Sequence, residues 1–193
     1  MPTIMMVWVV IVALLLAVSE SFVPPIQSLI PRSSSSSSLY SSSTNINSDT
    51  YDVNRKKLSS PAQEQIFDFF QALHSCGYPF RTIVIGSGAI LESTQTLGPT
   101  FKVSESPKTG NLILTMASQD QSFEFHVKLE QVHKIALVER QQESGKVLRI
   151  IRMTNEKEES ICSLILAEYS EGAATFFQDL VTKYGDEFLP YDS

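Results

Sequence analysis

The feature that most constrains this fold is the stretch 82–166, where short β-rich segments follow one another with no helical pattern between them. In the clearest segment, Phe123, Phe125, Val127 and Leu129 alternate with polar residues, which indicates a strand with one buried face. The other segments lie at 82–85, 89–91, 101–103, 111–116, 135–138, 147–153 and 161–166. Short strands at regular spacing, separated by polar turns, favour neighbours that run antiparallel.

Helix patterns flank this stretch on both sides. On the N-terminal side, Ser60 can cap a helix, Pro61 suits its first position, and Gln63 has the capping-box spacing. Gly77 ends this helix, and Gly185 ends the second one. The apolar stripes are Ile66, Phe69, Phe70 and Leu73 in the first helix and Phe177, Leu180, Val181 and Tyr184 in the second. We therefore predict an α+β domain, a curved antiparallel β-sheet of about six to eight strands flanked by an N-terminal and a C-terminal helix.

The N-terminal residues have the composition of a targeting signal. Residues 5–18 are 14 consecutive apolar residues, a run shorter than the roughly 20 residues that a membrane-spanning helix needs and typical of a secretory signal peptide. Ser19 and Ser21 stand at the small-residue positions of a cleavage site before Phe22. We predict a signal peptide over residues 1–21. A retained membrane anchor is the alternative, which the short run disfavours.

The next stretch is rich in serine. Nine of the 13 residues 32–44 are serine, and no Asp or Glu occurs between Ser21 and Ser48, as in organelle transit peptides. A signal peptide followed by such a segment, with Phe22 at the junction, resembles the bipartite plastid presequence of algae with secondary plastids. We predict that residues 22–57 are a transit peptide or disordered linker, that residues 58–193 are a single domain, and that the protein is delivered to a plastid (chloroplast). Secretion is the alternative.

Charge and cysteine content exclude several classes of protein. Residues 59–193 carry 11 Lys/Arg and 18 Asp/Glu, a formal net charge of −7. Affinity for nucleic acid comes largely from neutralised phosphates, so this acidic domain is not expected to bind one. Two cysteines, Cys76 and Cys162, are too few for a disulfide framework or an all-cysteine metal site. Because no catalytic acid–base set can be assembled from the sequence, an enzyme is the less favoured class.

Three polar residues are the candidates for binding a ligand. His126 lies on the polar side of its strand, where a ring nitrogen can reach a ligand or a metal ion; a solvated histidine is the alternative. Arg149 and Arg152 are an odd number of positions apart in one strand, so they face opposite sides. Arginine grips carboxylates through two hydrogen bonds, whereas a charge that protects a sheet edge is the alternative. His74 lies off the apolar stripe of its helix and is expected at the surface.

Three segments together suggest a family. They are TIVIGSGAILE (82–92), FHVKLEQVHKIALVER (125–140) and RIIRMTNEKEESICSLILAE (149–168). Their order, a strand into a glycine turn, a histidine-bearing strand and a strand–turn–strand, resembles intracellular heme-utilisation proteins of the ChuX/HutX type, relatives of the HemS heme-trafficking proteins. In this resemblance His126 falls where such proteins place a histidine that can face heme. The histidine that many of them carry before the glycine turn has no counterpart, because Ile85 and Gly86 occupy that region.

The resemblance implies a helix-flanked antiparallel sheet that binds heme or a related tetrapyrrole. The leading hypothesis is a plastid carrier, in which apolar side chains of the open sheet face cover the macrocycle, His126 contacts the iron, and Arg149 or Arg152 holds a propionate. The alternative is a non-enzymatic plastid accessory or assembly factor that kept the fold and binds a protein partner; the missing histidine favours it. A heme-degrading enzyme is the third hypothesis. The mature form is not expected to span a membrane, and a homodimer is left open.

Overall fold

The structure, a computed structural model, describes residues 48–191. The predicted signal peptide over 1–21 and most of the predicted transit segment over 22–57 lie outside the described residues. Among residues 48–191 no helix is both long enough and apolar enough to cross a membrane.

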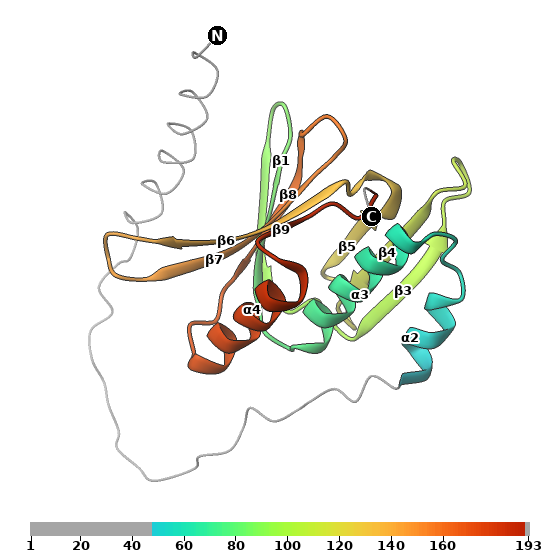
Figure 1. The fold of residues 1–193 in the computed structure, drawn as a ribbon. Coiled ribbons are helices and arrows are strands. Elements are labelled where there is room, and N and C mark those ends of the chain that lie inside the picture. The colour runs from blue at the N-terminus through green and yellow to red at the C-terminus, as the bar shows by residue number, and fades with distance from the viewer. Residues whose placement is uncertain (1–47, 192–193) are drawn as a thin grey trace. The chain divides into compact units, whose positions relative to one another are not determined.

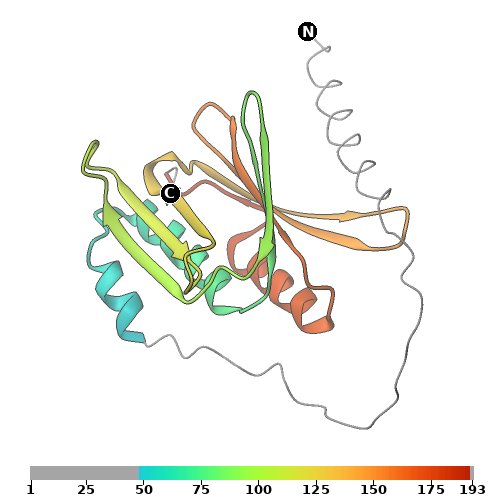
Figure 2. The same ribbon diagram turned by 180° about the vertical axis from the view of Figure 1, so that it is seen from behind.

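Nine strands in the described part of the chain form two antiparallel sheets (Figures 1 and 2). One sheet has six strands in the order β2-β1-β8-β7-β6-β9, and the other has three in the order β3-β4-β5. The strands are β1 (Phe80–Ile85), β2 (Ile90–Gln95), β3 (Thr100–Glu105), β4 (Leu112–Ala117), β5 (Glu124–Lys128), β6 (Lys134–Gln141), β7 (Val147–Thr154), β8 (Ser160–Leu166) and β9 (Glu187–Phe188). The α+β class and the antiparallel pairing are confirmed, with the strands divided between two sheets.

The chain changes sheet twice. Between β2 and β3 it passes Gly98, whose φ is +75° and whose Cβ, if present, would lie 2.2 Å from the carbonyl oxygen of Ala117. Only glycine fits this crossing, because other residues disfavour that φ and would clash. Between β5 and β6 a short 3-10 helix, η2 (Leu129–Gln131), interrupts the strand alternation. Both changes depend on contacts between distant segments, which strand periodicity does not contain.

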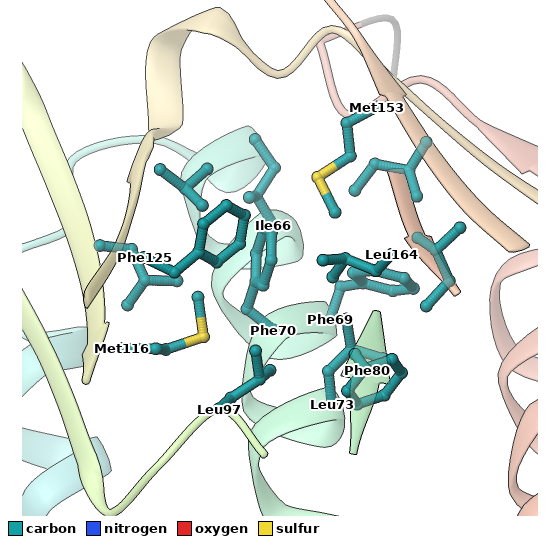
Figure 3. Packing of buried hydrophobic residues seen from close by; sticks show 14 of the residues in the cluster. Ile66, Phe69, Phe70, Leu73, Phe80, Leu97, Met116, Phe125, Met153 and Leu164 are labelled. Carbon is teal, nitrogen blue, oxygen red and sulfur yellow. The ribbon is translucent and has the colours of Figure 1, made fainter. Parts of the chain in front are cut away.

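Helix α3 (Pro61–Ser75) begins where the capping pattern predicts. The Ser60 hydroxyl accepts from the backbone N–H of Gln63 (3.3 Å), and the Gln63 side chain accepts from the backbone N–H of Ser59 (2.9 Å). Its predicted apolar stripe is completely buried. Figure 3 shows why: α3 lies between the two sheets, with Phe125 on one side of Phe70 and Leu164 on the other side of the helix. The rings of Phe70 and Phe125 are 6.4 Å apart.

Helix α4 (Glu171–Tyr184) joins the same core. Ser170 caps it by accepting from the backbone N–H of Ala173 (3.3 Å). At its other end the ring of Tyr184 stacks on Phe188 of β9 (5.1 Å) and meets Phe69 of α3 edge-on (5.2 Å). The predicted C-terminal helix is therefore confirmed, and it is joined to both α3 and the six-stranded sheet.

A further helix, α2 (Ser48–Arg55), lies inside the range 22–57 and packs on β3. Asn54 is only 5% exposed. Its Nδ2 donates to the carbonyl of Phe101 (3.0 Å), and its Oδ1 accepts from the N–H of Val103 (2.8 Å). The amide thus takes the place of a neighbouring strand along the edge of β3. The folded region therefore includes residues before 58.

The same helix shows that the predicted surface position of His74 is wrong. The His74 side chain is buried, with its Nδ1 at 2.8 Å from the Tyr51 hydroxyl and its ring 4.9 Å from that of Phe101. Tyr51 belongs to α2, which covers this side of α3. The pattern of α3 alone does not reveal this burial, because the cover comes from α2, which lies in the range predicted to be a transit peptide or linker.

Candidate functional site

The two faces of the six-stranded sheet have different surroundings. Alternate residues of a strand lie on opposite faces, and Ile135, Leu137, Ile151, Met153 and Leu164 belong to the core shared with α3 and α4. Among residues 48–191 the helices α3 and α4 pack on this core side, and we call the opposite side the helix-free face. Its apolar residues are Ile83, Ile85, Ile90, Ala136, Val138, Leu148, Ile150 and Ile165. Leu148, Ile150 and Ile165 are buried but do not belong to the core that contains the helices.

The strand register gathers these apolar residues side by side. Ile150 of β7 lies between Ile165 of β8 and Val138 of β6. The adjacent row holds Arg152 between Ser163 and Ala136, with Ile83 next to Ser163. Since residues two apart along a strand share a face, the side chain of Arg152 stands next to Ile150 within this apolar surface.

Arg152 is exposed, and within residues 48–191 its guanidinium has no ion pair or hydrogen bond. Arg81 lies on the same face, but its guanidinium is already in an ion pair, with its Nε 2.8 Å from a carboxylate oxygen of Glu92. An arginine can bind a carboxylate through two parallel hydrogen bonds. Arg152 therefore offers this chemistry on the helix-free face, and Arg81 is already engaged.

Arg149 faces the other side of β7, as the odd spacing predicts. It shares that face with Ile151 and Met153, and its Nε donates to Glu139 of β6 at 2.9 Å. Its side chain is only 14% exposed. Arg152 is paired with Ala136 of β6 and Ser163 of β8, so the alternative of a charge that protects a sheet edge does not apply to it. Arg149 is paired with Glu139 of β6 but lies beyond the end of the β7–β8 ladder at Ile150, so this alternative still fits Arg149.

His126 lies in the other sheet. It is on the outer face of β5, away from the buried Phe125 and Val127, and its side chain is 51% exposed. Its Nδ1 is 2.8 Å from the Thr115 hydroxyl, and its Nε2 is 3.1 Å from a carboxylate oxygen of Glu124. Both ring nitrogens therefore already have polar neighbours. The structure does not bring His126 together with Arg149 or Arg152.

Sequence reasoning missed the apolar residues that surround Arg152. A signal for them exists in β7, where Leu148 and Ile150 occupy one parity and Ile151 and Met153 the other. A strand that is apolar on both parities is expected to be covered, or to bind something, on both faces. Helices cover the face that carries Ile151 and Met153. Leu148 and Ile150 point to the other side of the strand and therefore mark the helix-free face.

A hollow of about 290 Å³ lies elsewhere in the described part of the chain. It is lined by residues of α2, α3 and α4, namely Arg55, Asp68, Gln71, Ala72, Ser75 and Lys183. Arg55 and Asp68 form an ion pair there. Small-molecule sites are mostly apolar with a few polar groups, whereas this lining is almost entirely polar. None of the three candidate residues lines it.

The cysteines and acidic side chains suggest no reactive centre. Burial raises the pKa of the Cys76 thiol to about 11 and that of the Cys162 thiol to about 12, so neither is a thiolate at neutral pH. Within residues 48–191 no group of three or more His, Cys, Asp or Glu side chains is placed to hold a metal ion. The helix-free face is therefore the candidate site, as a binding surface.

No family model matches this chain, and no curated protein is similar to it. Among solved structures, it is similar to the heme-binding protein ChuX, with a TM-score of 0.49 and 17% identity over 64% of this chain and 74% of that one. Holo-PhuS, a heme-binding protein from Pseudomonas aeruginosa, has a TM-score of 0.46 and 11% identity over 79% of this chain and 51% of that one. The heme-degrading enzyme ChuS from Escherichia coli O157:H7 has a TM-score of 0.47 and 11% identity over 61% of this chain and 34% of that one. Likenesses this distant carry no inference about what this chain binds.

Proposed function

We propose that this protein is a non-enzymatic carrier that binds heme or a related tetrapyrrole on the helix-free face. The observation that carries the proposal is the unpaired guanidinium of Arg152 beside Ile150 within an apolar sheet surface. A tetrapyrrole with free propionates is a flat apolar ring with carboxylates at one edge. The half-buried and exposed apolar side chains of this face, Ile83, Ile85, Ile90 and Val138, would cover the ring, and Arg152 would hold a propionate.

A partner for iron is a separate question. His126, which we predict from the sequence as the iron ligand, lies in the three-stranded sheet. To coordinate iron through Nδ1 or Nε2, it would have to give up its contact with Thr115 or Glu124. Ligation by His126 stays a prediction, and the proposal for the helix-free face does not depend on it.

The test is titration of the full chain with hemin, followed through the Soret band. We expect Arg152→Gln to weaken binding by about 10- to 100-fold, because a hydrogen bond to a charged group contributes about 1.5–3 kcal/mol. Arg149→Gln is the matched control, an arginine of the same strand on the opposite face, and should bind as the wild type does. If Arg152→Gln and wild type bind hemin equally, the proposal is wrong.

Two further titrations separate the contacts. Hemin dimethyl ester lacks free carboxylates, so it should bind wild type and Arg152→Gln with the same reduced affinity. His126→Ala tests the iron ligand: an unchanged Soret band and affinity in this variant would exclude His126 as that ligand, and a loss of the shift would support it.

The second candidate function is an accessory factor that binds a protein on the same face. The observation that favours it is the exposure of large apolar side chains at one end of this face, where Ile85 is 43% and Ile90 is 48% exposed, because exposed apolar patches are typical of protein–protein contacts. In that case the wild type would not bind hemin and would capture a plastid protein. The substitution Ile83→Asp, which places a charge on the face, should abolish this capture, whereas Val53→Asp on the exposed side of α2 should not.

We also propose that the N-terminal residues direct the protein to a plastid. The apolar run, the serine-rich segment and Phe22 at the junction support this proposal. A fluorescent protein fused behind residues 1–47 should accumulate in the plastid of an alga with secondary plastids. Fluorescence in the medium would favour the alternative, secretion.

A further inference from the structure

The outer edge of β2 carries unpaired backbone groups. The N–H of Gly86 donates to the carbonyl of Ala89 (2.9 Å), which fixes the phase of the β1–β2 ladder, because hydrogen-bonded pairs alternate along an antiparallel pair. From this phase and the register of the two strands, the residues of β2 that hydrogen-bond to β1 are Leu91, Ser93 and Gln95. The residues whose N–H and C=O groups point outward are Ile90, Glu92 and Thr94. No strand of residues 48–191 pairs with this side of β2.

Exposed apolar side chains accompany this open edge. Ile85 is 43% exposed, Ile90 is 48% exposed and Leu91 is 61% exposed. They lie together at the end of the β1–β2 hairpin, since Ile85 is the register partner of Ile90. Large apolar residues this exposed, next to unpaired backbone groups, are typical of a strand that pairs with another chain.

Other edges of the protein are protected. Asn54 covers the edge of β3, and the short β9 covers that of β6. The outward side chains of β5 are Glu124, His126 and Lys128, and such charges discourage pairing with another strand. In contrast, β2 has neither Lys nor Pro, and its single charge, Glu92, is already paired with Arg81.

We propose that a second copy of this chain pairs with β2 in antiparallel orientation around a two-fold axis at Leu91. This inference does not rest on the proposed ligand. Only residues with outward backbone groups can form the new hydrogen-bonded pairs, so a symmetric axis that forms at least two such pairs within the strand must pass through Leu91, Glu92 or Ser93. The three choices differ in which side chains they place opposite each other.

The axis at Leu91 is the one that suits these side chains. It pairs Ile90 with the partner's Glu92 and Glu92 with the partner's Ile90, which gives four backbone hydrogen bonds. It also sets Leu91 against the partner's Leu91 and makes the two Ile90 side chains diagonal neighbours. An axis at Glu92 would set two like charges opposite each other. An axis at Ser93 would set Leu91 against the partner's Gln95.

The proposal predicts that a cysteine introduced at one position of β2 forms a disulfide with the same position of the second copy. Residues opposite each other in a non-hydrogen-bonded pair have Cα atoms about 4.5 Å apart, which is within the range of a disulfide. Mild oxidation should therefore cross-link the Leu91→Cys chain into a dimer. Thr94→Cys is the matched control, because two copies of residue 94 would lie about 20 Å apart along the strands. The native Cys76 and Cys162 are present in both variants and in the wild type.

Sedimentation of the full chain tests the hydrogen bonds. Proline at position 92 removes only an outward N–H, so Glu92→Pro should halve the mass of the wild-type dimer while Glu92→Gln keeps it. Using the full chain makes any association through residues 1–47 common to all variants. Circular dichroism checks that Glu92→Pro is folded; if it is not, the cross-linking result decides. A wild-type monomer, a dimer unchanged by Glu92→Pro in the folded variant, or equal cross-linking at residues 91 and 94 would each overturn the proposal.

Discussion

His74 shows how one buried side chain makes the stability of the fold depend on pH. Its burial between Tyr51 and Phe101 lowers its pKa below the usual value of 6.5. The folded protein therefore resists protonation at this site, whereas the unfolded chain takes up the proton as the pH falls through about 6.5. It follows that His74 reduces stability as the pH falls, by at most about 1.4 kcal/mol per pH unit for one proton.

We predict that His74→Gln flattens this dependence. Urea unfolding between about pH 7 and about pH 5 should show a decrease in stability for the wild type that is smaller in His74→Gln, since glutamine cannot take up a proton. Val53→Ala, which changes an exposed residue that has no titrating group and leaves His74 in place, should keep the wild-type slope. Identical slopes for His74→Gln and wild type would show that His74 is not the titrating group.

At the scale of helices and strands, the sequence predicts the features that depend on residues close together in the chain. The cap at Ser60 and the alternation around Phe125 identify α3 and β5, and odd spacing correctly puts Arg149 and Arg152 on opposite faces. The place of helix α2 in the fold could not be predicted in this way. Asn54 attaches α2 to β3 by hydrogen bonds that span 47 and 49 positions of sequence, and a local pattern does not contain such contacts. The ion pair of Arg149 and the apolar surroundings of Arg152 likewise require the register between strands, which periodicity does not contain.

We predict that a chain beginning at residue 59 is less stable than one beginning at residue 48. Removing α2 takes away the buried Tyr51 and Asn54 and uncovers the edge of β3. Burial of one large apolar side chain contributes about 1.5–3 kcal/mol, so the loss should be at least about 2 kcal/mol in urea unfolding, with more association at high concentration. Val53→Ala, at an exposed position of α2, should leave the longer chain unchanged. Equal stability of the two chains would mean that α2 is not part of the folding unit.

At the scale of the whole described region, α3 decides whether two sheets behave as one unit. The sheets share no strand, and Figure 3 shows side chains of α3 between them. Phe70 is completely buried and contacts Phe125 of the three-stranded sheet and Phe69 beside it. Removing the Phe70 side chain should therefore destabilise both sheets, because a common core couples them into one cooperative unfolding transition.

Phe70→Ala tests this coupling. We expect it to cost about 3–5 kcal/mol and to reduce the hydrogen-exchange protection of slow amides in β4 and β8 by the same free energy, since both exchange through global unfolding. Phe176→Ala, at a half-buried position of α4 beside Tyr78, should lower both protections equally but by less. If Phe70→Ala speeds exchange in β4 and leaves β8 unchanged, each sheet opens on its own, and the three-stranded sheet can move without disturbing the helix-free face.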